Sequence, residues 1–184
     1  MVYVSGGNEL IDPLKLLSRL RVTTGSVVAD LGCGGAGHFV IPAAKLVGRK
    51  TNVFAVDILK SVLASVTSIG RLEGVSNIKA VWADLEIPGG TNIKPASLDC
   101  ALLVNTLFLS TKHEAILQEA VRLVKSGGKI SVVEWKDQGQ NFGPTKTALV
   151  DPEKIKLMAK KLNLKLIDQF DAGKHHYGLT FQTS

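Results

Sequence analysis

A glycine-rich loop at residues 32–37 constrains the fold of this chain more than any other feature. Its sequence, Gly-Cys-Gly-Gly-Ala-Gly, matches the pattern G-x-G-x-x-G. A compact apolar run at 26–31 precedes the loop, and an apolar helical pattern at 39–47 follows it. Glycines in such a turn allow a tight backbone and let N–H groups at the start of a helix approach a ligand. The sequence therefore predicts a strand, a ligand-binding turn and a helix, as in open α/β sheets.

Short apolar runs and longer helical patterns alternate along the rest of the chain. Further strands are predicted at 52–57, 78–83, 98–104, 129–135, 164–170 and 177–182. Strands alternating with amphipathic helices predict an α/β protein with a mostly parallel sheet and helices on both faces. The last two strands are joined by so short a loop that they must form an antiparallel hairpin, because a parallel crossover needs about a dozen residues. The Pro/Gly-rich stretch 88–95 predicts a short or broken crossover, and Thr111 with Glu114 predicts a capping box before the next helix.

The length of 184 residues fits one domain. We divide it into an N-terminal helical segment (1–25), a cofactor-binding core (26–136), a loop (137–150) and a C-terminal helix and hairpin (151–184). No apolar run approaches the roughly 20 residues of a membrane-spanning helix. The start of the chain lacks the pattern of a signal peptide, so we expect a cytoplasmic protein.

The net charge of +6 could indicate a nucleic-acid partner, but the pattern does not favour one. Many of the lysines lie on or just after one predicted helix, where long cations usually form a solvated face. Aromatic residues make up only 5% of the chain, which leaves no obvious platform for stacking bases. Cys33 and Cys100 have neither the spacing of a zinc site nor the number for a disulfide framework, so we expect no metal and two buried thiols.

Three aspartates stand at the ends of the first three predicted strands. Asp30, Asp57 and Asp84 are 27 residues apart in each case. Because ligands of open α/β sheets bind at the carboxyl ends of the strands, we expect all three to border one crevice. Such a rim suits a cationic ligand rich in hydrogen-bond donors and disfavours a pyrophosphate. Asp57 alone would also suit an NAD-dependent oxidoreductase, whereas Asp30 beside the loop argues against one.

Five segments resemble, in order, the motifs of class I S-adenosylmethionine-dependent methyltransferases: 27–37, 54–57, 82–85, 98–105 and 123–129. The segments 133–136 and 142–144 make the chain similar to the small ubiquinone/menaquinone-biosynthesis-like (type 11) members. The resemblance implies a Rossmann-like methyltransferase fold with seven strands in the order 3-2-1-4-5-7-6, the last antiparallel. The weak helix between strands three and four departs from this pattern.

The resemblance also implies how S-adenosylmethionine would be held, with S-adenosylhomocysteine as product. Asp30 and the loop would hold the methionine moiety, Asp57 the ribose hydroxyls and Asp84 the adenine amine. Asn105 would lie beside the sulfonium. The full set of implied donor-binding residues is Asp30, Gly32, Cys33, Gly34, Gly37, Asp57, Ile58, Ala83, Asp84, Leu85 and Asn105.

Methyl transfer needs alignment of donor and acceptor more than it needs acid–base groups. Candidate bases are His38, directly after the glycine loop, and Glu134, at the end of the fifth predicted strand. A small-molecule acceptor is favoured, because residues 105–108 lack the Asn-Pro-Pro-aromatic pattern of base-amine methylation. An RNA or protein methyltransferase and a non-catalytic, donor-binding partner subunit remain alternatives. Few residues are left for a lid, so the acceptor site is either open or completed by a partner subunit. The protein could also form a homo-oligomer.

Overall fold

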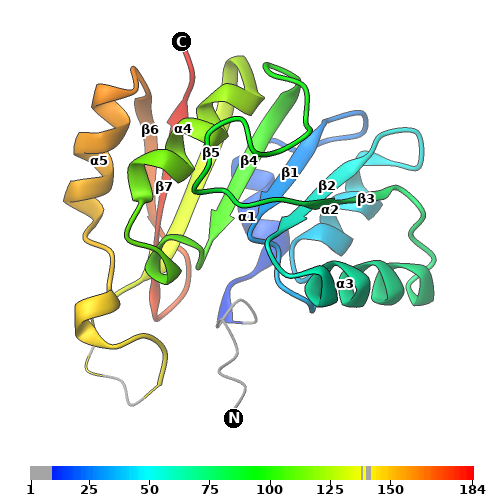
Figure 1. Ribbon diagram of the computed structural model, residues 1–184, viewed down its shortest axis with the longest axis horizontal. Coiled ribbons are helices and arrows are strands. Elements are labelled where there is room, and N and C mark those ends of the chain that lie inside the picture. Colours follow the sequence, from blue (N-terminus) through cyan, green and yellow to red (C-terminus); the bar gives the residue numbers. More distant parts are fainter. Residues whose placement is uncertain (1–9, 138, 140–141) are drawn as a thin grey trace.

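The structure is a computed structural model that describes residues 10–137, 139 and 142–184 (Figure 1). Its centre is a single seven-stranded sheet in the order β3-β2-β1-β4-β5-β7-β6, as predicted. The strands pair in parallel from β3 to β5, and β7 pairs antiparallel with both β5 and β6. The strands are β1 (Val28–Leu31), β2 (Val53–Asp57), β3 (Ile78–Trp82), β4 (Leu98–Val104), β5 (Val124–Trp135), β6 (Lys165–Asp171) and β7 (His176–Gln182).

Helices cover both faces of the sheet (Figure 1). Side chains of α1, α2 and α3 share one apolar cluster with inward residues of β1 and β2, and those of α4 and α5 share another with β4, β5 and β7. All four residues of β1 are buried, because this central strand is covered on both sides. The α-helices are α1 (Pro13–Arg19), α2 (Val40–Val47), α3 (Lys60–Leu72), α4 (His113–Leu123) and α5 (Pro152–Lys161).

Parallel pairing brings the carboxyl ends of the central strands to one edge. Asp30 on β1 is in register with Ala55 on β2, and Asp57 at the end of β2 is in register with Trp82 on β3. The glycine loop, the residues after β3 and the residues after β4 therefore leave the sheet at the same edge. The functional site lies at this edge.

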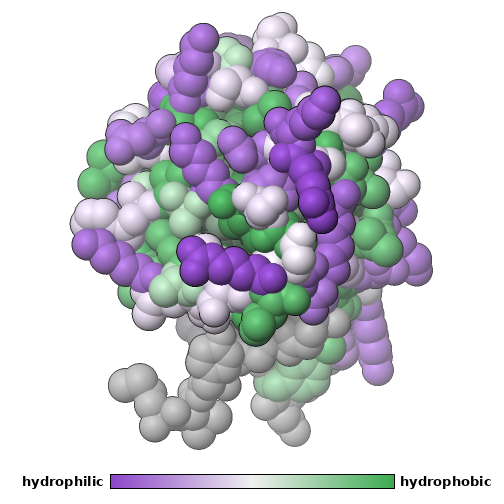
Figure 2. Space-filling model, turned by 90° about the vertical axis from the view of Figure 1, so that its right-hand side faces the viewer, coloured by the Kyte–Doolittle hydropathy of each residue, from purple (hydrophilic) through white to green (hydrophobic). Residues whose placement is uncertain are grey.

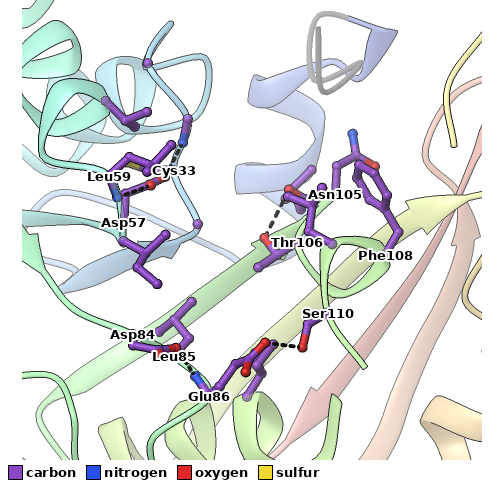
Figure 3. Close-up of a pocket in the computed structure, with 18 of the residues that line it drawn as sticks. Cys33, Asp57, Leu59, Asp84, Leu85, Glu86, Asn105, Thr106, Phe108 and Ser110 are labelled. Atoms are coloured by element: carbon purple, nitrogen blue, oxygen red, sulfur yellow. Dashed lines mark hydrogen bonds between the residues drawn. The ribbon is translucent and has the colours of Figure 1, made fainter. Parts of the chain in front are cut away.

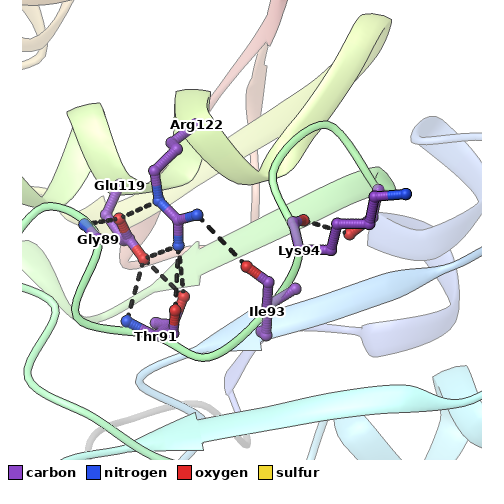
Figure 4. Close-up of polar contacts among 7 residues, drawn as sticks. Gly89, Thr91, Ile93, Lys94, Glu119 and Arg122 are labelled. Atoms are coloured by element: carbon purple, nitrogen blue, oxygen red, sulfur yellow. Dashed lines mark hydrogen bonds and ion pairs between the residues drawn. The ribbon is translucent and has the colours of Figure 1, made fainter.

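The connection from β3 to β4 contains no helix, which fits the short or broken crossover predicted from its proline and glycine residues. The side chain of Glu119 on α4 fixes this connection by hydrogen bonds (Figure 4). Glu119 is fully buried and accepts hydrogen bonds from the Gly89 N–H (2.6 Å) and the Thr91 hydroxyl (2.6 Å). Arg122 donates to Glu119 (2.6 Å) and to the carbonyl oxygens of Thr91 (3.2 Å) and Ile93 (3.3 Å). Burial opposes ionisation of Glu119, but these hydrogen bonds outweigh it and lower its pKa to about 2.

Two local predictions were wrong. The residue that precedes α4 is Lys112, whose side chain makes no capping hydrogen bond, so Thr111 and Glu114 form no capping box. The Ser110 hydroxyl accepts the Lys112 N–H instead, at 2.9 Å. Strand β5 begins at Val124, earlier than predicted, because its first residue pairs with Leu98 on β4. A local contact two residues away therefore accompanies the start of α4, whereas a tertiary contact decided the start of β5.

Candidate active site

A cavity of about 660 Å³ opens at the carboxyl edge of the sheet, within the usual size range of ligand sites (Figure 3). Its walls come from the glycine loop, the ends of β2, β3, β4 and β5, and the loop after β5. Of the implied donor-binding residues, the structure places the following along the cavity: Gly32, Cys33, Gly34, Asp57, Ile58, Ala83, Asp84, Leu85 and Asn105.

The glycine loop lies very close to Thr106, the residue that follows Asn105. Gly32 has φ +86°, and a Cβ there would lie 2.6 Å from Thr106 Oγ1. The Thr106 hydroxyl donates to the Leu31 carbonyl oxygen at 2.9 Å, which joins the end of β1 to the end of β4. Gly34 has φ +64° and open space where its Cβ would be, so the loop leaves room for a ligand.

Gly37 has a packing role in this structure. A Cβ there would lie 2.9 Å from both Ile41 and Val66, where α2 and α3 meet, and Gly37 is not among the residues that line the cavity. The last glycine of the motif therefore lets a helix pack closely, as the pattern requires in open α/β sheets.

Two of the three strand-end aspartates line the cavity. Asp57 accepts hydrogen bonds from the Gly34 N–H (3.3 Å) and the Leu59 N–H (3.0 Å), so it is held against the glycine loop. Asp84 accepts the Glu86 N–H at 2.8 Å. Both residues are partly exposed, so each keeps acceptor capacity for donors of a bound molecule.

Asp30 does not border the cavity, which corrects the expectation that all three aspartates do. It lies behind the glycine loop and is 1% exposed. Burial and the charge of Asp57 raise its pKa to about 7. Its Oδ2 makes no hydrogen bond to any described residue. A buried carboxylate oxygen without a hydrogen-bond donor is unfavourable, and a nearby cationic or hydrogen-bond-donating group of a ligand would compensate for it.

The opposite wall of the cavity is apolar and was not predicted. Trp135 at the end of β5 is 2% exposed and lines this wall, together with Phe108, Leu109, Ile116 and Pro144. Gly143, with φ +84°, lies against the Trp135 ring, and a Cβ there would be 3.0 Å from it. The Phe142–Gly143–Pro144 segment was part of the sequence resemblance, but only the fold brings it to Trp135.

The two candidate bases differ in position. His38 lines the cavity, and its Nε2 lies 2.8 Å from the Ile11 carbonyl oxygen, so this nitrogen carries a proton. Glu134 is fully buried and outside the cavity lining. It accepts the Leu107 N–H at 2.6 Å, and burial raises its pKa to about 8 despite this bond. Glu134 therefore stabilises the start of the short helix η2 (Leu107–Leu109) through this hydrogen bond.

Two further properties concern metals and membranes. Within residues 10–137, 139 and 142–184, no group of three or more His, Cys, Asp or Glu side chains is arranged to hold a metal ion. No helix in this described part of the chain has the length and apolarity to cross a bilayer.

A mostly parallel sheet in this order, with a glycine loop after its first strand and carboxylates at the carboxyl ends of the next two strands, defines a class I S-adenosylmethionine-dependent methyltransferase fold. The model of the methyltransferase domain family matches residues 23–177, which are most of the chain. This chain belongs to that family.

Individual relatives agree with this assignment. The ubiquinone/menaquinone biosynthesis C-methyltransferase UbiE of Citrobacter koseri is 30% identical over 118 residues, which are 62% of this chain and 44% of that protein. The aklanonic acid methyltransferase DauC of Streptomyces sp. strain C5 is 32% identical over 85 residues, 45% of this chain and 38% of that protein. This chain thus spans less than half the length of either matched relative. A crystal structure of a SAM-dependent methyltransferase from Aquifex aeolicus superposes with a TM-score of 0.86 at 19% identity, covering 97% of this chain and 93% of that one.

Proposed function

We propose that this chain transfers the methyl group of S-adenosylmethionine to a small, largely apolar acceptor. One observation carries the proposal: a single cavity has a polar wall made by Asp57, Asp84 and the glycine loop, and an apolar wall made by Phe108 and Trp135. The polar wall matches a nucleoside rich in hydrogen-bond donors. The apolar wall matches a flat or aliphatic molecule that carries the methyl-accepting atom.

Different residues of the polar wall would bind different parts of the methyl donor. Asp57 would accept hydrogen bonds from the two ribose hydroxyls, and Asp84 from the adenine amine, with Ile58 and Leu85 against the ring. The loop from Gly32 to Gly34 would face the methionine moiety, and Asp30 behind it would favour a positive charge there. When bound, the donor supplies an activated methyl carbon on a sulfonium.

The apolar wall would place the acceptor and exclude water. Alignment of two reactants in this way can lower a barrier by roughly 7–11 kcal/mol. Among the described residues, Asp57, Asp84 and Glu86 are the carboxylates that line the cavity, whereas Glu134 is buried and outside its lining. His38 lies on the other side of the cavity, next to the glycine loop, and remains the candidate base for an acceptor that must lose a proton. The names of UbiE and DauC support a small molecule as acceptor.

The first test is calorimetry with S-adenosylhomocysteine, with NADH as the competing ligand. Saturable binding of the nucleoside product is expected, and tight binding of NADH alone would contradict the donor assignment.

The second test incubates the protein with methyl-labelled S-adenosylmethionine and a cell extract, then separates organic-soluble, aqueous, RNA and protein fractions. We expect the label in organic-soluble small molecules. Label in RNA or protein would contradict the proposed acceptor, and firm donor binding without any transfer would favour a non-catalytic subunit.

A further inference from the structure

Glu86 forms a bridge between two walls of the cavity (Figure 3). Its carboxylate accepts the Ser110 hydroxyl at 2.6 Å and lies 3.0 Å from Lys112 Nζ. Ser110 in turn accepts the Lys112 N–H at 2.9 Å. Both Glu86 and Ser110 line the cavity. The bridge therefore joins the segment after β3 to the segment after β4 at the cavity itself.

On the side of the methyl-donor site, the bridge is connected to Asp84, the residue proposed to bind the adenine amine. The Glu86 N–H donates to Asp84 Oδ1 at 2.8 Å, so the Asp84 carboxylate and the Glu86 backbone are fixed relative to each other. The turn continues with the Ile87 N–H, which donates to the Asp84 carbonyl oxygen at 3.3 Å. A molecule that binds Asp84 would thus order the backbone from which Glu86 extends.

On its other side, the bridge ends at the apolar wall. Ser110 directly follows η2, which carries Phe108 and Leu109 into the cavity. Among the described residues, Glu86 makes the only hydrogen bonds or ion pair between segments 84–91 and 106–112. Lys112 is 64% exposed, so its ion pair with Glu86 contributes little, and the Ser110 hydrogen bond is the main link.

We propose that Glu86 is a positioning residue that couples the donor site to the acceptor wall through Ser110. Binding of the donor at Asp84 stabilises the turn that carries Glu86, and Glu86 in turn stabilises η2 in the place where Phe108 lines the acceptor side. Filling the donor site thereby reduces the mobility of the acceptor wall. This inference rests on the proposed donor site but adds a dependence between the two halves of the cavity. Ser110 and Lys112 lower the pKa of Glu86, so the bridge is charged at neutral pH.

Amide hydrogen exchange read by mass spectrometry tests the coupling without knowledge of the acceptor. In the unmodified protein, S-adenosylhomocysteine should slow exchange in both 83–90 and 106–113, by about fivefold or more in the second segment. Glu86→Ala and Ser110→Ala should each keep the protection of 83–90 and lose most of the protection of 106–113. Glu86→Gln keeps an oxygen acceptor for Ser110 and should restore it. Glu73→Ala is the matched control, because Glu73 forms an exposed pair with Lys45 (2.8 Å) outside the cavity.

The outcomes separate the inference from the proposed function. Full protection of 106–113 in both alanine variants, or its loss in Glu86→Gln as in Glu86→Ala, would overturn the coupling. Protection restricted to 83–90 in the unmodified protein would overturn it as well. If S-adenosylhomocysteine gives no calorimetric heat and protects neither segment, the donor site itself is wrong. Ser110→Ala keeps the test valid should a Glu86 variant fail to fold.

Discussion

Substitution of Asp57 by Asn should weaken binding of S-adenosylhomocysteine while leaving the fold intact. Asp57 lines the cavity, and its two carboxylate oxygens accept the N–H groups of Gly34 (3.3 Å) and Leu59 (3.0 Å). Asn keeps one oxygen acceptor, but its NH₂ group cannot accept from a backbone N–H or from a ribose hydroxyl. The change therefore removes the charge and one acceptor from the wall proposed to hold the ribose.

The magnitude follows from the bonds that are lost. A hydrogen bond to a charged acceptor contributes about 1.5–3 kcal/mol, and we take about 2 kcal/mol for the loss. This corresponds to a rise of about 30-fold in the Kd of S-adenosylhomocysteine. Isothermal titration calorimetry measures the Kd, and urea unfolding of each variant measures the fold.

Asp99→Asn is the matched control. Asp99 also accepts a backbone N–H, that of Val27 at 2.7 Å, and pairs with Lys125 at 3.0 Å, but it lies outside the cavity. This variant should lose stability without losing affinity. If Asp57→Asn binds S-adenosylhomocysteine as tightly as the unmodified protein, or if both variants lose affinity equally, the ribose assignment is wrong.

Three further predictions concern stability and pH. Glu119→Gln should lower the free energy of unfolding, measured in urea, by about 3 kcal/mol, because it breaks a buried pair with Arg122. This loss should be complete above about pH 5. It should shrink towards pH 2, because Glu119 of the unmodified protein is then also protonated. The affinity for S-adenosylhomocysteine should rise as the pH increases through about 7, because Asp30 ionises there, and calorimetry on Asp30→Asn should show a flat profile. Gly32→Ala should destabilise the fold by more than Gly34→Ala, because only the first adds a Cβ 2.6 Å from Thr106 Oγ1; equal unfolding midpoints would contradict this.

Local sequence patterns predicted the architecture and most of the polar wall of the cavity. Alternation of apolar runs and helical patterns is a local property, so it predicted seven strands and their parallel and antiparallel parts. The Pro/Gly-rich stretch 88–95 predicted a short or broken crossover between the third and fourth strands. The glycine motif and the equal spacing of the aspartates then placed Asp57 and Asp84 at one edge, because parallel strands end at the same side. The order of the strands came from the family resemblance.

Which side chains reach the cavity depends on long-range packing that local patterns do not encode. Asp30 lies one residue before the end of β1 and is buried behind the loop, whereas Asp57 ends its strand and is partly exposed. The apolar wall joins residues after β4 with Trp135 and a loop beyond β5, and no local pattern links segments so distant in sequence. The Glu119 and Glu86 contacts depend in the same way on long-range packing, which fixes side-chain positions that periodicity cannot specify.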